Sequence, residues 1–396
     1  SFLNKVFINQ NKTQLSIHEY LDLENNIYGT ISFIHLLQFA YEHNESVIEK
    51  IDTPKIWDTN QYLILTQDSI SQLNVVDNSS NSNLNNKYNS LLGIVNNAST
   101  ALGKRYLREQ LLNPINSTEK LKQRYQCIRE LQNRNEEGTP KFRLVEENLK
   151  KIMDIERLHR RMGLRILQPA DFANLDMAYL NIVNLLENRD IFIPGSSLEN
   201  ILPEEEELNK FKNFIEEYTD LFDLDEIGKY HLNNVTNSFF NVGKIEEIDI
   251  IAKKMKVMRE RFDIIANKLS NYIEDHSNFI KVEYTDKDGY YLQTTKRRGE
   301  TLKKSLNKLG NKSFSVSDSM KTINFKPKDF ELKFLKDRTK IHSELLTKMS
   351  YKLRNYQDTL QKKTTEVYLE KLEYFYEKYQ ETLQKISILV AKLDFF

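Results

Sequence analysis

Two long stretches of this chain lack both glycine and proline, the residues that most readily interrupt a helix. The first runs from Lys244 to Asp288 and the second from Lys328 to Phe396. In both, apolar residues recur at spacings of three and four, as on one face of an α-helix. A helix covering the whole second stretch would rise about 100 Å at ~1.5 Å per residue. Because that length exceeds a compact domain, the sequence predicts lever-like or coiled-coil helices.

Between the two stretches the apolar period changes from that of a helix to that of a strand. An alternating run precedes the turn Asp286–Gly289, and Tyr290–Thr295 is its predicted partner strand. Ser313–Ser317 and Lys321–Phe325 have the pattern of a second hairpin. The sequence therefore predicts a small β-rich head, at about residues 279–327, inserted at the far end of two antiparallel helices.

The remainder of the chain is predicted to be helical, with a mixed first region. Tyr62–Thr66 is strand-like, and the polar stretch Asp77–Ser90 is typical of a surface loop. Helices are expected near residues 31–41, 91–112, 117–133, 140–165 and 169–188. The predicted fold class is mainly α, a multi-helical core with long antiparallel lever helices and a small β-rich insertion at their tip.

The charge of the chain is balanced overall but unevenly distributed. It has 57 Lys and Arg against 57 Asp and Glu, so the total charge does not indicate a nucleic-acid partner. Between Lys296 and Lys340, however, there are fourteen basic and five acidic residues, whereas Ser196–Glu226 holds eleven acids and two lysines. Opposed patches favour oriented binding, with the basic end toward phosphate. Ordinary solvated helix faces are the alternative interpretation.

Several blocks of sequence, in order, carry a family resemblance. They are SLLGIVNNASTALGKRYLREQLLNPI (90–115), KLKQRYQCIRELQ (120–132), IMDIERLHRRMGLRILQPADFANL (152–175), NVGKIEEIDIIAKKM (241–255), IKVEYTDKDGYYLQTTKR (280–297) and the closing ISILVAKLDFF. From about residue 30 to Phe396 the chain resembles the MutS family of DNA mismatch-repair proteins, from the opening of its core domain to the end of its lever. Gly289–Gln293 retains the clamp signature G-Y-Y-[IL]-Q, but Asp288 stands where the family usually has His.

The resemblance implies both an organisation and a function. Residues 1–248 would form the helical core and the start of the lever, 249–340 the clamp with its flanking lever helix, and 341–396 the returning lever helix. An ATPase domain would follow, and the family implies a homodimer that encircles duplex DNA. The full-length parent is therefore expected to be an ATPase that uses ATP and Mg. This portion is expected to be no enzyme and to bind no cofactor itself.

The basic run coincides with the predicted clamp. Burial of a core does not explain so many cations there, whereas phosphate contacts provide affinity without sequence reading, as a DNA-scanning protein requires. These cations are expected to follow a strand and to precede a polar loop. The predicted DNA-binding residues are Lys296, Arg297, Arg298, Lys303, Lys304, Lys308, Lys312, Lys321, Lys326 and Lys328.

Other candidate chemistry has a structural interpretation. The sequence contains no G-x-x-x-x-G-K-[ST] phosphate loop, and Gly103–Arg105, its nearest approach, lies in a predicted helix. Cys127 is the only cysteine, which excludes an intramolecular disulfide and a thiolate zinc site. We interpret His159 as part of a helix-packing salt network and Glu204–Glu207 as a solvated first turn. We therefore predict no catalytic or metal-binding residues.

Two other functions fit the same residues. One is a branch of the MutS family that recognises junctions or recombination intermediates, because the sequence lacks the mismatch-reading domain with its Phe-x-Glu motif. The other is a helical scaffold whose basic head binds a protein, which a failure to bind nucleic acid at low salt would favour. No signal peptide or membrane-length apolar stretch is evident, so an intracellular, DNA-associated protein is expected. Its Lys, Asn and Ile content is typical of AT-biased viral, organellar or parasite genomes.

Overall fold

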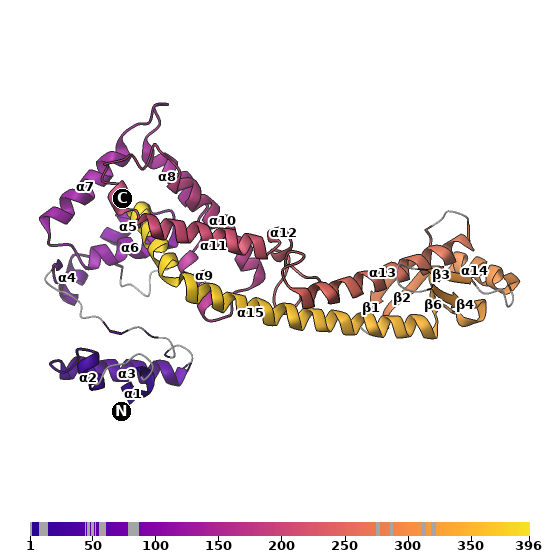
Figure 1. Ribbon diagram of the computed structural model, residues 1–396. Coiled ribbons are helices and arrows are strands. Elements are labelled where there is room, and N and C mark those ends of the chain that lie inside the picture. Colours follow the sequence, from indigo (N-terminus) through magenta and orange to yellow (C-terminus); the bar gives the residue numbers. More distant parts are fainter. Residues whose placement is uncertain are drawn as a thin grey trace. The chain divides into compact units, whose positions relative to one another are not determined.

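The computed structural model is mainly α-helical with a small antiparallel sheet, which confirms the predicted fold class (Figure 1). It describes residues 2–7, 15–43, 45, 48, 51, 53–54, 61–77, 87–274, 278–285, 288–309, 314–317 and 322–396. The chain forms two compact units. The core unit comprises Ser1–Leu167, Asn174–Phe214 and Leu372–Phe396, and the lever unit comprises Gln168–Ala173 and Ile215–Lys371. Among the described helices, none has the length and apolar character needed to cross a membrane.

The first helices of the core unit have a hydrophobic cluster of their own. They are α1 (Phe2–Phe7), α2 (Ile17–Tyr20) and α3 (Ile27–His43). Leu3, Phe7 and Leu37 are buried in this cluster. Ser16 begins α2 with a capping box, in which its side chain accepts from the Glu19 amide while the Glu19 carboxylate accepts from the Ser16 amide. Local sequence thus sets the start of α2, and burial holds the three helices together.

The remaining core-unit helices include two pairs that the sequence pattern predicted as single helices. Their bounds are α4 Gln67–Gln72, α5 Leu91–Val95, α6 Ala101–Leu112, α7 Thr118–Gln132, α8 Lys141–Leu149 and α9 Ile155–Gly163, with α10 Pro169–Leu186 and α11 Glu205–Leu221 reaching into the lever unit. The predicted helices 91–112 and 140–165 were each wrong as single elements. New N-caps, Thr100 and Asp154, begin α6 and α9 within them.

The polar first region also differs in detail. The strand-like run at Tyr62 makes only an isolated bridge to Ile115. The predicted loop Asp77–Ser90 lies mostly outside the described residues, and its last part forms the short 3₁₀ helix η3 (Lys87–Asn89).

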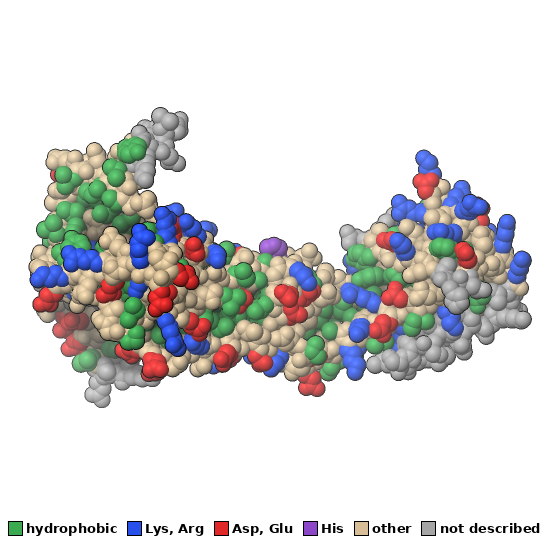
Figure 2. Space-filling view, turned by 90° about the horizontal axis from the view of Figure 1, so that it is seen from above, with side chains coloured by type: hydrophobic (Ala, Val, Ile, Leu, Met, Phe, Trp, Pro, Cys, Tyr) green, Lys and Arg blue, Asp and Glu red, His purple; other side chains and the backbone are tan. Residues whose placement is uncertain are grey.

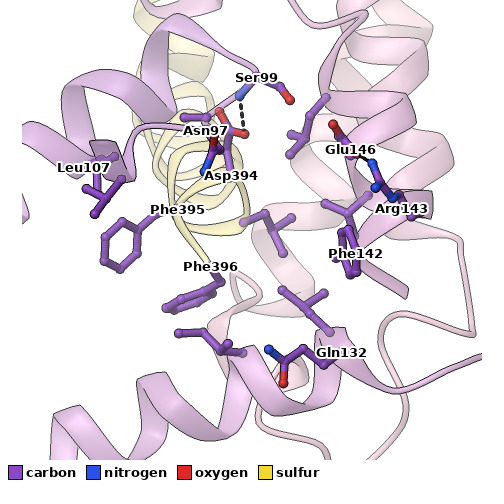
Figure 3. A pocket seen from close by; sticks show the side chains of 17 residues that line it. Asn97, Ser99, Leu107, Gln132, Phe142, Arg143, Glu146, Asp394, Phe395 and Phe396 are labelled. Carbon is purple, nitrogen blue, oxygen red and sulfur yellow. Dashed lines mark hydrogen bonds and ion pairs between the residues drawn. The ribbon is translucent and has the colours of Figure 1, made fainter. Parts of the chain in front are cut away.

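The end of α15 is fastened to the start of α6 by one carboxylate. Asp394 accepts a hydrogen bond from the backbone amide of Ser99 (2.8 Å), which Figure 3 shows. It also accepts hydrogen bonds from the backbone amide (2.7 Å) and the hydroxyl (2.6 Å) of Thr100. Gly103 lies against the same carboxylate, and a Cβ placed there would be 2.0 Å from Asp394 Oδ2. The Gly103–Arg105 run is therefore helical and structural, as predicted.

The lever unit is built on two long helices that lie side by side (Figure 1). They are α13 (Glu246–Asn271) and α15 (Glu344–Phe395, 52 residues), and the short α12 (Leu224–Ile227) precedes them. The apolar repeat of α13 is buried as predicted, including Ile248, Met255 and Phe262. The sequence pattern predicted that the second long helix begins near Lys328, and this was wrong, because α15 begins at Glu344. The residues before it form two strands, which lack Gly and Pro as a helix would.

The head contains a four-stranded antiparallel sheet in the order β1-β2-β6-β5. Its strands are β1 Lys281–Thr285, β2 Gly289–Thr295, β5 Glu331–Phe334 and β6 Arg338–His342. A separate hairpin pairs β3 (Phe314–Ser317) with β4 (Thr322–Phe325), so both predicted hairpins are present. The helix α14 (Lys296–Leu309) and the 3₁₀ helix η5 (Pro327–Asp329) complete the head.

We expect Gly103→Ala to destabilise the protein. Gly to Ala in an exposed helix normally stabilises by about 1 kcal/mol. Here the added methyl group would displace the Asp394 carboxylate from its three donors, so we expect a net loss of at least about 1 kcal/mol in the free energy of unfolding. Urea unfolding measures this free energy for the variant and the parent. The control is Lys104→Ala, a substitution at an exposed position of the same helix. A more stable Gly103→Ala protein would contradict the role given to this contact.

Candidate nucleic-acid interface

Six of the ten predicted DNA-binding residues lie on the single helix α14. They are Lys296, Arg297, Arg298, Lys303, Lys304 and Lys308. Lys326 and Lys328 are exposed at η5. Lys312 and Lys321 lie outside the described residues. These six cations follow β2 directly, as predicted, and they lie on a helix that the sequence pattern did not predict, because its few apolar residues make a weak periodic signal. The residues that come directly after α14 lie outside the described ones.

The helix α14 is oriented by a narrow apolar face. Leu302 and Leu306 are buried, and Gly299 sits so close to the sheet that a Cβ there would be 2.2 Å from the Thr339 hydroxyl oxygen. The opposite face carries Arg297, Lys304 and Lys308, which are spaced by seven and four residues and therefore share one line along the helix. Packing against the sheet thus turns this line of cations toward solvent.

A shallow hollow of about 310 Å³ lies along one flank of α14. Its lining combines three lysines with Glu300, Asn307 and the ring of Phe334 from β5. Lys303 Nζ lies 5.6 Å from the centre of that ring. The lysines of the hollow are Lys296, Lys303 and Lys304. Cations and an amide around a concave surface are suited to an oxyanion such as a phosphate group.

Arg298 differs from its neighbours on α14. Its guanidinium carbon lies 3.6 Å from the centre of the Phe279 ring, and the side chain is half-buried. A stacked guanidinium of this kind stabilises packing. Arg298 therefore helps to hold α14 on the residues that precede β1, on a different side of the helix from Arg297 and Lys304.

The sheet carries further cations that sequence reasoning missed. The strand register places Lys281, Gln293, Lys340 and Lys333 in one row across β1, β2, β6 and β5. Lys340 is engaged there, since its ammonium pairs with Asp288 and lies 4.3 Å from the centre of the Tyr291 ring. In β5 the charged Glu331 and Lys333 alternate with Leu332 and Phe334, and in β6 Arg338 and Lys340 alternate with the uncharged Thr339 and Ile341. This alternation is the strand signal that could have located these cations.

Basic side chains predominate among the described residues on the face of the head that Figure 2 shows. Acidic neighbours are fewer, and one of them, Asp288, is paired with Lys340. The surroundings affect His342 on β6, where partial burial, followed by the charge of Lys333, lowers the imidazole pKa below its usual value. His342 is therefore uncharged at neutral pH, and the cationic character of the head comes from Lys and Arg.

The buried polar groups of the core unit are structural. His159 shares hydrogen bonds with the Tyr179 hydroxyl (Nε2, 2.7 Å) and the Ser387 hydroxyl (Nδ1, 3.3 Å). Burial lowers the pKa of His159 to about 3, so the ring is neutral. The predicted salt network around His159 was wrong, since Arg105 instead pairs with Asp154 and Glu156.

The acidic run at the start of α11 is only partly solvated. Glu207 is buried, and its carboxylate accepts from the Thr382 hydroxyl (2.6 Å) and from Lys385 (3.0 Å). The Thr382 hydrogen bond is the main reason that the Glu207 pKa falls to about 2, with Lys385 adding to it. Glu205 and Glu206 are exposed, so the predicted solvated turn is right for them and wrong for Glu207.

A cavity of about 700 Å³ beside the end of α15 is lined by both apolar and polar side chains (Figure 3). Phe395, Phe396 and Phe142 point into it, and Asp394 at its edge is already bonded to Ser99 and Thr100. Within the part of the chain that the structure describes, no three His, Cys, Asp or Glu side chains converge as metal ligands.

Comparison with known proteins agrees with this architecture. A family model described as MutS domain III matches residues 68–396, which include the helical core, both lever helices and the head. The chain belongs to the MutS family.

The MutS relatives extend well beyond the region that matches. A DNA mismatch repair protein mutS homolog of Acanthamoeba polyphaga mimivirus is 28% identical over 99% of this chain and 35% of its own length. DNA mismatch repair protein MutS of Caldanaerobacter subterraneus subsp. tengcongensis is 24% identical over 70% of this chain and 30% of its own length. The mitochondrial DNA mismatch repair protein mutS homolog of Sarcophyton glaucum is 24% identical over 75% of this chain and 29% of its own length. The chain thus spans about a third of the length of these MutS relatives.

We expect His159 to make this MutS-family chain less stable in mild acid. The unfolded chain binds a proton at His159 below about pH 6.5, whereas the folded protein does so only near pH 3. Stability should therefore fall as pH drops from about 6.5 toward 3, by up to roughly 1.4 kcal/mol per pH unit. The free energy of unfolding, measured with urea between pH 7 and 4.5, should fall less steeply with decreasing pH for His159→Gln than for the parent. The exposed His35→Gln is the control, and equal slopes for both variants would contradict the assignment.

Proposed function

We propose that this part of a MutS-family protein grips duplex DNA through the phosphate backbone, with the head acting as a clamp. The observation that carries the proposal is the line of Arg297, Lys304 and Lys308, which packing of α14 on the sheet turns outward. Such cations release counterions when they meet phosphates, which produces affinity for any sequence. The relatives are named as DNA mismatch repair proteins, and a clamp that binds any sequence suits that process.

The proposal includes a division of labour along the chain. Residues 1–248 would form the helical core, 249–340 the clamp with its flanking lever helix, and 341–396 the returning lever. In the full-length protein the levers would relay the nucleotide state of an ATPase domain to the clamp. ATP and Mg would bind in that domain, so we expect this portion to neither hydrolyse nucleotide nor hold a cofactor. The expected partners are duplex DNA and a second copy of the full-length protein, in an intracellular, DNA-associated setting.

Within this MutS framework, junctions or recombination intermediates are a second class of target. A clamp that contacts only phosphates would hold a mismatched duplex and a junction arm in the same way. The cationic line on α14 supports both targets equally, whereas the names of the relatives favour mismatch repair.

The charge-reversed variant Arg297→Glu, Lys304→Glu, Lys308→Glu tests the clamp. Removal of one phosphate-binding cation should reduce the slope of log K against log salt by roughly 0.9, so the slope should fall by about two to three in this variant. Affinity for duplexes of unrelated sequence should fall alike, while helix content and melting stay unchanged, because the three side chains are exposed. Fluorescence anisotropy with labelled duplexes, titrated with salt from ~50 mM upward, measures both quantities.

A matched variant separates local binding from general charge. Lys281→Glu, Lys333→Glu and Lys336→Glu also reverse three exposed cations of the head, but on β1, β5 and the turn after β5. An equal fall in affinity for both variants would show that overall charge, and not α14, governs binding. Unchanged affinity of the α14 variant at ~50 mM salt, or a weakening confined to one DNA sequence, would refute the backbone clamp.

A further inference from the structure

Two buried serine hydroxyls, one on each lever helix, bind backbone amides of the head. Ser270, near the end of α13, is fully buried, and its Oγ accepts from the amides of Phe279 (3.2 Å) and Ile280 (3.0 Å). Ser350 on α15 is also buried, and its Oγ accepts from the amide of Tyr290 (2.7 Å). The first two amides directly precede β1, and the third belongs to the start of β2. The head is therefore hydrogen-bonded to both levers.

The start of β2 is shaped for its contact with α15. Gly289 has a φ of +68°, a left-handed conformation that favours glycine, and a Cβ placed there would be 2.4 Å from Ser350 Oγ. The Tyr290 hydroxyl donates to Gln357 (3.1 Å), which lies seven residues after Ser350 and therefore on the same line of α15. The Tyr290 ring also meets that of Phe262 on α13, with 6.2 Å between the ring centres. This end of β2 is thus fastened to α15 at two points.

The hydrogen bonds fix the direction of the β1–β2 hairpin as well as its position. Apolar contact is non-directional and permits sliding, whereas an N–H···O bond weakens steeply when it is misaligned. Because β1 and β2 are antiparallel, Ser270 holds the open end of the hairpin, where β1 begins, and Ser350 holds the turn end, where β2 begins. One bond would leave the hairpin free to pivot, but bonds at both ends set its angle to the levers.

The hairpin in turn carries the cationic helix α14. At the open end, the Phe279 ring stacks on the guanidinium of Arg298, and the Phe279 carbonyl accepts from the Thr294 hydroxyl (3.0 Å). At its far end β2 runs directly into α14, about 20 Å from the turn. A rotation of about 10° at the turn would therefore move the start of α14 by about 3–4 Å. A charge-assisted hydrogen bond to phosphate is only about 2.8 Å long, so a shift of this size would break it.

We propose that Ser270 and Ser350 are positioning residues for the grip on DNA, which hold the cationic line of α14 at a fixed angle to the levers. The proposal rests on the proposed function and deepens it, because it assigns the contacts that aim the phosphate-binding surface. Both serines are buried, so neither touches DNA itself. The affinity for DNA therefore depends on them, whereas the number of phosphates contacted does not.

Ser270→Ala and Ser350→Ala test the proposal in the full 396-residue chain. Each substitution removes only the oxygen that accepts from the head. The matched control is Thr364→Val, which also removes a buried hydroxyl from α15. In the part of the chain that the structure describes, the Thr364 hydroxyl has no hydrogen-bond partner, so its removal should leave the head in place.

The first readout is the distance between the head and a lever. Spin labels are attached at the exposed positions Lys336→Cys, after β5, and Lys362→Cys, on α15. The native Cys127 is buried, and burial raises the pKa of its thiol, so it should label little. Pulsed electron paramagnetic resonance should give one narrow distance distribution for the parent and for Thr364→Val. Each serine variant should give a broader one.

The second readout is DNA binding by the unlabelled proteins, measured by anisotropy well below their melting temperatures. A head that spends about a tenth of its time in the binding orientation binds about tenfold more weakly, so we expect a roughly three- to tenfold loss for each serine variant. The slope of log K against log salt should stay that of the parent, because no cation is removed. The α14 charge-reversed variant should lower this slope. A general loss of stability would not weaken binding at temperatures where the variant remains folded.

The outcomes separate this proposal from the proposed function. If the parent does not bind duplex DNA at ~50 mM salt, the proposed function fails and the positioning role fails with it. If the parent binds and the α14 variant behaves as expected, parent-like distance distributions in both serine variants would overturn the positioning role alone. A broadened distribution without loss of affinity, or a loss of affinity with a reduced salt slope, would overturn it too.

A milder variant decides the question if a serine variant loses its helix content. Tyr290→Phe removes only the hydroxyl that donates to Gln357 and retains the ring against Phe262. A smaller broadening of the distance distribution, with weaker binding at an unchanged salt slope, is the expected result. A distribution and an affinity equal to those of the parent would count against the proposal.

Discussion

Burial of the apolar stripe of α15 is the constraint on which both compact units depend. In the lever unit this stripe includes Leu353, Leu360 and Tyr368, and in the core unit it continues through Phe375 and Ile386. Each such side chain contributes about 1.5–3 kcal/mol when it leaves water. A helix of 52 residues gains most of its stability from this packing and not from local propensity. The absence of Gly and Pro permits its length, and burial on each unit keeps it in one conformation.

Aromatic contacts show how each unit uses its part of α15. In the lever unit, Tyr368 meets Phe222 and Phe239 at ring separations of 5.9 and 5.5 Å. In the core unit, Phe375 and Tyr379 both meet Phe214. Aromatic pairs of this kind add about 0.5–1.5 kcal/mol beyond their buried area. Tyr368, Phe375 and Tyr379 of the last helix are therefore core residues.

Residue types that often carry chemistry serve packing in this chain. Asp394 satisfies the amides that begin α6, His159 joins Tyr179 to Ser387, and Glu207 joins α11 to α15. Each group is buried or half-buried, so the free energy of removing it from water is offset only because its hydrogen bonds are made. The cations of α14 are different. Packing accounts for Leu302 and Leu306 but not for the charges opposite them, which is why we propose a polyanion as their partner.

The sequence by itself determined the kinds of elements and much of their length. Periodic apolar residues predicted α13, most of α15 and both hairpins, because the spacing of side chains along a helix or a strand is a property of the backbone. The density of Lys and Arg located the head as the basic region. Tertiary structure decided which cations share a surface, and it reinforced the local cap at Thr100 with a contact from a distant part of the chain. Asp394 binds Ser99 and Thr100 from almost 300 residues away, and no local pattern contains that contact. Likewise β5 and β6 are strands because Leu332 and Ile341 pair beside Leu292, and α14 faces as it does because Gly299 meets Thr339. Such pairings depend on contacts between residues distant in the chain, which only the folded protein brings together.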